Sequence, residues 1–140
     1  MRALIALATL ALFCSVAVLQ SACGPQACTL IGCRNGVTLR IHSPTGAPAT
    51  AFSGTVAWDG ESVAFACPYT EARPSECLEG SVFFPVEAPP GQVHVTIQST
   101  SDGSSFSGTV DLEETVSYPN GPECGPECRN ASAVVTLQSP

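Results

Sequence analysis

Apolar and polar side chains alternate with a period of two through most of the chain after residue 36, and this pattern restricts the fold more than any other feature. Successive side chains of an extended strand point to opposite faces, so each alternating segment is predicted to be a strand with one buried face. No stretch of this region has the apolar spacing of an amphipathic helix. The alternating segments are 37–41, 52–58, 61–67, 82–86, 92–98, 106–112 and 135–137. About seven such strands, separated by turns, predict an all-β, Ig-like β-sandwich.

The clearest local prediction is a β-hairpin centred on Asp59-Gly60. This dipeptide is typical of two-residue turns that join antiparallel strands, and alternating apolar residues lie on both sides of it. A two-residue turn sets the register and predicts these facing pairs: Trp58–Glu61, Val56–Val63, Gly54–Phe65 and Phe52–Cys67. Both apolar sets then lie on the same side of the hairpin.

Two further details of the strand pattern carry predictions. Pro85 interrupts the segment 82–86, and a proline has no N–H for a sheet ladder, so this strand is predicted to lie at a sheet edge. The sequence Phe-Ser-Gly-Thr-Val occurs twice, at 52–56 and 106–110. Only five residues match, so we interpret the repeat as two strands with the same inward-facing pattern.

Residues 1–22 are predicted to be a cleaved signal peptide with a helical apolar segment. Arg2 precedes a mostly apolar run over 3–19. A membrane-spanning helix needs about 20 apolar residues, and this run has no cationic stop after it, so cleavage is favoured over a span. The small residues Ser21 and Ala22 come immediately before Cys23.

The segment Leu19-Gln20-Ser21-Ala22-Cys23 resembles the bacterial lipobox, in which an aliphatic residue and two small residues precede a lipid-modified cysteine. It departs from the usual pattern at Gln20, where that family has leucine. The resemblance implies that Cys23 is acylated and that the lipid bilayer is the first partner. It also implies a bacterial lipoprotein of the cell envelope, and Gly24 in place of aspartate is compatible with the outer membrane.

Cysteine parity agrees with this reading of the leader. Of the eight cysteines, Cys14 would leave with the signal peptide and Cys23 would carry lipid, which leaves an even set compatible with three disulfides in an oxidising compartment. The six candidates are Cys28, Cys33, Cys67, Cys77, Cys124 and Cys128. Fifteen pairings are possible; one of them, Cys67–Cys77, would staple an exposed loop. Cys124 and Cys128 could bond to each other or anchor different strands. The chain therefore divides into a signal peptide at 1–22, a short cysteine-containing neck at 23–36 and a sandwich domain at 37–140.

The order of strands also resembles that of prealbumin-like domains, which include carboxypeptidase regulatory-like modules. The resemblance rests on the strand 37–41 followed by Ser43-Pro44-Thr45-Gly46-Ala47-Pro48, on the run 90–97, which begins with the second proline of a pair, and on a closing strand at 134–137. Such domains are accessory sandwiches without an active site, so this resemblance implies a fold and a structural or binding role.

Charge and composition disfavour several functions. After the predicted cleavage the chain has four arginines, no lysine and twelve carboxylates, a formal net charge of −8, which argues against nucleic acid as a partner. His42 and His94 fall on the polar phase of their strands, without ligands at metal-binding spacing. Carboxylates that could ligate calcium lack the spacing of a calcium loop and are expected to be solvated; they are Asp59, Glu61, Asp111, Glu113 and Glu114. We therefore predict no enzyme activity, no catalytic residues, no metal and no cofactor.

The expected function is that of a membrane-anchored, non-enzymatic structural or binding module. The loops 68–76, 99–105 and 117–130 are the expected contact surface, because a rigid sandwich leaves recognition to its loops. Another envelope protein or a glycan would be the partner. The alternative is a secreted hydrolase inhibitor or accessory domain that uses a stiff Cys67–Cys77 loop with Arg73-Pro74-Ser75 at its tip.

Overall fold

The computed structural model describes residue 32 and residues 34–68 and 75–140, which belong to one compact unit, Ile31–Pro140. The predicted signal peptide and three cysteines of the neck, Cys23, Cys28 and Cys33, lie outside the described residues, as does Arg73. The described part is all-β, with nine strands and no helix. The predicted all-β sandwich is therefore confirmed, with nine strands in place of about seven.

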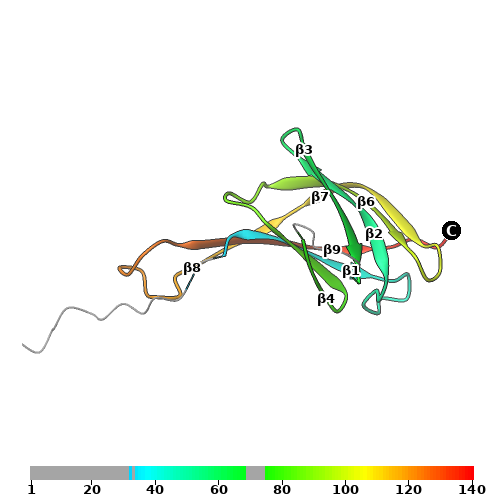
Figure 1. Cartoon of the computed structure of the whole chain (residues 1–140), viewed down its shortest axis with the longest axis horizontal. Helices are drawn as coiled ribbons and strands as arrows, with labels where there is room; N and C mark the ends of the chain where they lie inside the picture. The colour runs from blue at the N-terminus through cyan, green and yellow to red at the C-terminus, as the bar shows by residue number, and fades with distance from the viewer. Residues whose placement is uncertain (1–31, 33, 69–74) are drawn as a thin grey trace, which may run out of the picture. The chain divides into compact units, whose positions relative to one another are not determined.

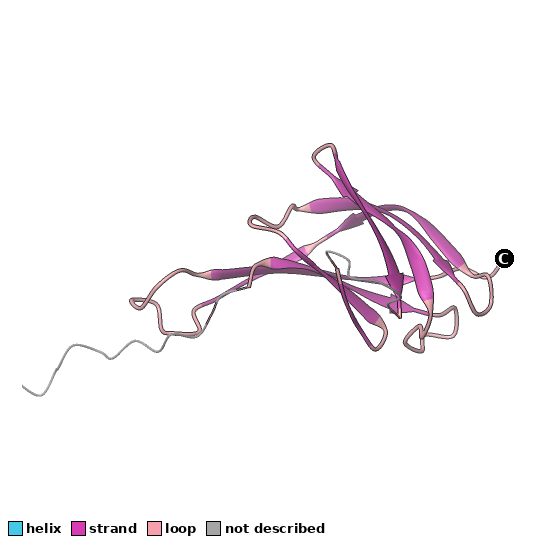
Figure 2. Cartoon of the chain, viewed as in Figure 1, coloured by secondary structure: helices cyan, strands magenta, loops and turns pink. Residues whose placement is uncertain are grey.

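Two sheets face each other across the core (Figures 1 and 2). The five-stranded sheet A has the order β4–β5–β1–β9–β8: Glu76–Leu78, Ser81–Pro85, Gly36–His42, Cys128–Thr136 and Glu113–Ser117. The four-stranded sheet B has the order β3–β2–β6–β7: Glu61–Cys67, Phe52–Trp58, Gln92–Ser99 and Ser105–Asp111. β1 and β9 run parallel, and every other strand pair is antiparallel.

The core lies between the inner faces of the two sheets, where the period-two pattern places apolar side chains. Three phenylalanines form its centre: Phe65 lies edge-on to Phe52, with ring centroids 6.3 Å apart, and to Phe84 at 5.3 Å. Burying a side chain of this size stabilises the fold by about 1.5–3 kcal/mol. The largest of the other fully buried side chains come from β1, β2, β5 and β6, and from the residue after β9: Leu39, Ile41, Val37, Val56, Val82, Val93, Val95, Ile97 and Leu137.

The β2–β3 hairpin forms with the predicted register. All four predicted pairs are present, from Trp58 opposite Glu61 to Phe52 opposite Cys67. Asp59 and Gly60 have φ values of 46° and 84°, the left-handed conformation that a tight turn between twisted strands requires. Glycine adopts it without strain and aspartate tolerates it, which explains why this dipeptide stands here.

The prediction that the proline-containing strand lies at a sheet edge is wrong. β5 lies inside sheet A, between β4 and β1. Its other neighbour, the three-residue β4, pairs only with residues 81–83. Pro85 is the last residue of β5 and has no partner on that side, so its missing N–H interrupts no ladder. On this side the edge of sheet A is β4, and the opposite edge is β8.

The C-terminal strand is longer than predicted, and β8 was not predicted. β9 begins at Cys128, and its first five residues pair with β8. All five residues of β8 are exposed. Figure 1 shows this β8–β9 ribbon extending beyond the region where the two sheets face each other.

Strand directions divide the loops between two ends of the sandwich. The end where β1 begins, called here the neck end, also has the turn 59–60, the loop 86–91 and the segment 118–127. The opposite end, called the far end, has the loop 43–51, the turn 79–80, the tip 100–104 and the C-terminus (Figure 1).

Candidate functional site

The three loops expected to form one contact surface lie at opposite ends of the sandwich. The tip 100–104 is at the far end, as is Pro68, where the stapled loop leaves β3. The segment 117–130 is at the neck end, and part of it belongs to β8 and β9. The prediction of a single contact surface is therefore corrected to two separate groups of loops.

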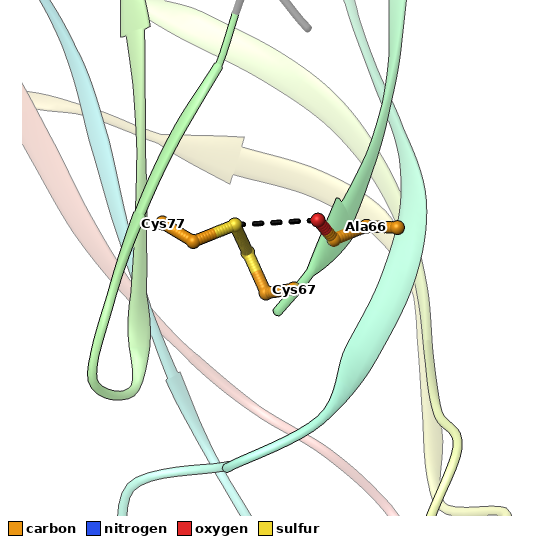
Figure 3. The surroundings of a disulfide bond; sticks show 3 residues. All are labelled: Ala66, Cys67 and Cys77. Atoms are coloured by element: carbon orange, nitrogen blue, oxygen red, sulfur yellow. Dashed lines mark hydrogen bonds between the residues drawn. A yellow bond between two sulfur atoms is a disulfide. The ribbon is translucent and has the colours of Figure 1, made fainter. Parts of the chain in front are cut away.

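Cys67 and Cys77 form the predicted disulfide (Figure 3). Their Cα atoms are 5.7 Å apart, and the bond joins the end of β3 in sheet B to β4 in sheet A. Cys77 Sγ also lies 3.3 Å from the carbonyl oxygen of Ala66. A sulfur in a disulfide carries no proton, so this is a close sulfur–oxygen contact and not a donated hydrogen bond. The disulfide therefore holds together the two strands that flank the loop, one in sheet B and the other in sheet A.

Cys124 and Cys128 are disulfide-bonded as well. Cys128 is buried at the start of β9, and Cys124 is partly buried in the loop before it. All four cysteines in the described part of the chain are therefore oxidised. This state fits an oxidising compartment, since cytosolic thiols are normally kept reduced.

Hydrogen bonds to Asp102 order the far-end tip. The Asp102 carboxylate accepts from the Ser104 amide at 3.0 Å and from its hydroxyl at 2.7 Å. The hydroxyl of Ser99 accepts from the amides of Ser101 and Asp102. Hydrogen bonding to Ser99 and Ser104 lowers the pKa of Asp102 to about 2. Both serines are buried, so these bonds satisfy their hydroxyl groups within the turn.

At the neck end, the two residues before β1 are attached to sheet A. Arg34 binds both carboxylate oxygens of Glu76, at 2.6 and 3.1 Å. Its guanidinium also lies over the ring of Phe83, 5.1 Å from the centroid. Hydrogen bonding to Arg34 lowers the pKa of Glu76. The Phe83 ring in turn lies over Gly36, where a Cβ would come within 2.3 Å of it.

Asn35 connects two further segments of the neck end. Its side-chain amide donates to the carbonyl oxygen of Glu87, and its oxygen accepts from the Arg129 amide, both at 2.9 Å. Arg129 itself forms ion pairs with Glu127 and Glu114. The chain that leaves the neck is thus held by β9 and by the loop after β5.

A cleft of about 280 Å³ opens at the same end, between the hairpin of sheet B and the end of β5. Trp58 is half-buried in it, and its facing partner Glu61 is exposed. The other wall comes from the segment 84–88, which includes Glu87. A second hollow of about 370 Å³ lies on Arg34, Asn35, Pro85, Val86 and Glu87. The hairpin register indicated that Trp58 and Glu61 are neighbours, but only the packing of the two sheets brings residues 84–88 to them.

The two histidines differ in exposure. His94 is exposed on β6, as predicted, whereas His42, also predicted to face solvent, is half-buried at the end of β1. The backbone of His42 pairs with Pro48 and accepts a hydrogen bond from the Leu137 amide. Among the described residues, no three His, Cys, Asp or Glu side chains are grouped closely enough to hold a metal ion.

The carboxylates considered for calcium lie apart. Asp111 accepts a hydrogen bond from Gln92 at 2.6 Å, and Glu114 pairs with Arg129 in the β8–β9 ribbon. Asp59 and Glu61 belong to the β2–β3 turn instead.

Comparisons with known proteins identify no relative. The chain matches no protein-family model, and no curated protein or solved structure is significantly similar to it. In the part of the chain that the structure describes, no helix has the length and apolar character to cross a membrane.

Proposed function

We propose that this protein is a lipid-anchored lipoprotein of the bacterial cell envelope and that it acts as a non-enzymatic binding module. The observation that carries the proposal is the oxidised state of every described cysteine, because it supports export to an oxidising compartment. The leader before Cys23 adds the anchor by its resemblance to a lipobox. Two or three acyl chains on Cys23 would hold the domain far more firmly than one.

The attachment of the neck gives this proposal an orientation. Arg34 and Asn35 lie only a short distance along the chain from Cys23 and are bonded to sheet A at the neck end. An anchor at Cys23 would keep the neck end close to the membrane. The far-end tip with Asp102 would then face away from the bilayer and meet another envelope protein or a glycan.

We extend the proposal to the remaining disulfides. Cys67 is bonded to Cys77, and Cys124 and Cys128 are disulfide-bonded as well. Of the six cysteines expected to remain beside the lipid-modified Cys23, Cys28 and Cys33 are the other two, so three disulfides would use all six. The two remaining bonds are either Cys28–Cys33 with Cys124–Cys128, or two bonds that join the neck cysteines to Cys124 and Cys128.

Membrane partitioning and mass spectrometry test the anchor. After detergent phase separation, the protein from its native host is expected in the detergent phase, with an intact mass that begins at Cys23 and includes acyl chains. Cys23→Ser should move it to the aqueous phase. Cys14→Ser is the matched control, since Cys14 lies in the predicted leader, and it should leave partitioning unchanged. Wild-type protein in the aqueous phase, without acyl mass, would refute the anchor.

A peptide map without reduction tests the disulfides of the same sample. We expect Cys28 and Cys33 in disulfide-linked peptides, and the linked partners show which of the two arrangements is present. A free thiol at Cys28 or Cys33 would refute the three disulfides while leaving the anchor untouched.

The alternative function, a secreted hydrolase inhibitor or accessory domain, is favoured by one observation. The Cys67–Cys77 bond joins the two flanks of a loop, which is what a stiff inhibitory loop requires. The tip residue Arg73 lies outside the described residues. Inhibition of an arginine-specific protease that is lost in Arg73→Ala would favour this function, and absence of inhibition would remove it.

A further inference from the structure

The cleft at the neck end combines an aromatic ring, apolar walls and two carboxylates. Trp58 and Glu61 face each other directly beside the β2–β3 turn, where Cβ atoms of paired residues are about 5 Å apart. Glu87 comes from the loop after β5 and lines the opposite wall. The rest of the lining is apolar: Val63, Phe84, Pro85, Val86 and Ala88.

The two carboxylates have no cation within the described residues. Arg34 is paired with Glu76, and Arg129 with Glu114 and Glu127, and no described residue forms an ion pair with Glu61 or Glu87. The chain has a large excess of carboxylates, and two of them among the lining residues of one cleft favour the binding of a positive group there.

Elsewhere in this protein an aromatic ring and a carboxylate already bind a guanidinium. On the outer face of sheet A, the Arg34 guanidinium lies over Phe83 while it binds the Glu76 carboxylate through two hydrogen bonds. There the guanidinium contacts the aromatic ring and forms an ion pair with the carboxylate. The cleft offers an indole, the aromatic group that binds cations best, and carboxylates on two walls.

The geometry points to an arginine side chain of a partner protein as the occupant of the Trp58 cleft. A guanidinium is planar, so it can stack on the indole while its N–H groups bind a carboxylate. Its aliphatic stem would lie against the apolar wall. Arginine fits this combination better than lysine, whose ammonium is a strongly hydrated point charge.

This inference deepens the binding role proposed above and rests on that role, but not on the lipid anchor. Partitioning tests the anchor, and binding at Trp58 tests the cleft, so either can fail without the other.

Trp58 is the only tryptophan in the chain, so its fluorescence reports on this cleft alone. The full-length protein in a neutral detergent is titrated with a short blocked peptide that contains one arginine. The control peptide has citrulline there, which keeps the shape and removes the charge. We expect a saturable change in Trp58 emission with the arginine peptide and no change with the citrulline peptide. A peptide with lysine in place of the arginine should give a weaker change.

Variants and salt separate charge recognition from simple apolar contact. Glu61→Gln and Glu87→Gln should each weaken arginine binding roughly twofold to fivefold. Glu79→Gln, in the exposed turn at the far end, is the matched control and should bind like the wild type. Raising the ionic strength from about 0.01 to about 0.15 M should also weaken binding, since it shortens the Debye length from about 30 to about 8 Å.

Several outcomes would overturn the inference. Equal binding of the arginine and citrulline peptides would reduce the cleft to an apolar contact. Unchanged affinity in both glutamine variants, or no saturable change with any peptide, would remove the site. Tighter binding of a free polyamine such as spermidine would assign the cleft to a small amine in place of a protein side chain.

Discussion

Asp102 illustrates how a single short side chain orders a loop. The tip 100–104 contributes little to the core, and its order comes from hydrogen bonds between Asp102 and the buried serines on either side. The ionised carboxylate is the better acceptor, so these bonds stabilise the charged form and lower its pKa to about 2. The local stability of the tip is therefore linked to pH.

We predict that Asp102→Asn destabilises the protein at neutral pH and that the difference from wild type shrinks in acid. The folded pKa lies below the ordinary value of 3.8, so this stabilisation is present above pH 4. It is lost as the pH falls from about 4 to about 2, because the carboxylate then binds a proton in the folded state as well. Urea unfolding of both proteins across this range measures the effect.

Glu113→Gln on the exposed β8 controls for the loss of one negative charge in that experiment. A difference between Asp102→Asn and wild type that stays constant from neutral pH to pH 2 would contradict the role given to the carboxylate.

At the scale of the strand, the two copies of Phe-Ser-Gly-Thr-Val occupy different environments. The first copy lies in β2, inside sheet B, where a Cβ on Gly54 would come within 2.0 Å of the Thr96 carbonyl oxygen. The second lies in the edge strand β7, where a Cβ on Gly108 would meet only the Phe106 ring, at 3.3 Å. A ring can move aside, and a backbone carbonyl inside a sheet cannot.

We predict that Gly54→Ala lowers the free energy of unfolding by about 1–3 kcal/mol or more, as overpacking does. Gly108→Ala is its matched control in the same local sequence. It should be near neutral, because alanine is favoured over glycine in a strand by roughly 0.5–1 kcal/mol and offsets the small displacement of Phe106. Thermal or urea unfolding measures the stability of the two variants. Equal destabilisation would contradict the explanation that only Gly54 is too close to a backbone atom for a Cβ.

The success of sequence-based prediction differed from strand to strand. Asp59-Gly60 allows only one register between two alternating segments, so the β2–β3 pairing was predictable residue by residue. β8 was not, because all of its residues are exposed and a strand without a buried face has no alternation to detect. The position of β5 in the sheet was predicted wrongly. A proline indicates only that its own residue donates no hydrogen bond, and it says nothing about whether the other residues of the strand pair on both sides.

The candidate site was predictable to a similar, partial extent. The pairing of Trp58 with Glu61 follows from the hairpin, and the Cys67–Cys77 bond was one of the pairings considered. The contribution of Glu87 was not accessible, since it depends on how sheet A packs over sheet B. Contacts between sheets involve residues far apart in the sequence, and no local pattern encodes them.

At the scale of the whole molecule, the Cys67–Cys77 bond is the covalent link between the two sheets in the described residues. The shortest strand, β4, sits at a sheet edge and pairs over only three residues. Hydrogen bonding alone gives such a strand little stability, so the disulfide should contribute much of what holds it.

We predict that the double variant Cys67→Ala/Cys77→Ala lowers the free energy of unfolding by about 2–3 kcal/mol, the amount expected from closing a loop of about ten residues. Alanine avoids placing a hydroxyl in the buried position of Cys67. Urea denaturation measures the change, and limited proteolysis should show faster cleavage between the two sites. An unchanged unfolding midpoint would mean that other contacts hold this loop.

The parallel pairing of β1 and β9 determines how the domain would bear tension. β1 starts at the neck end and β9 finishes at the far end, with seven residue pairs between them. A load that enters through the neck and is resisted at the far end pulls the two strands past each other. Their hydrogen bonds lie across that direction and must break together, whereas the bonds of a hairpin pulled at its open end rupture one at a time. The β1–β9 pair, which lies next to the proposed anchor, would therefore be loaded in shear. A pair of strands resists force best in this geometry.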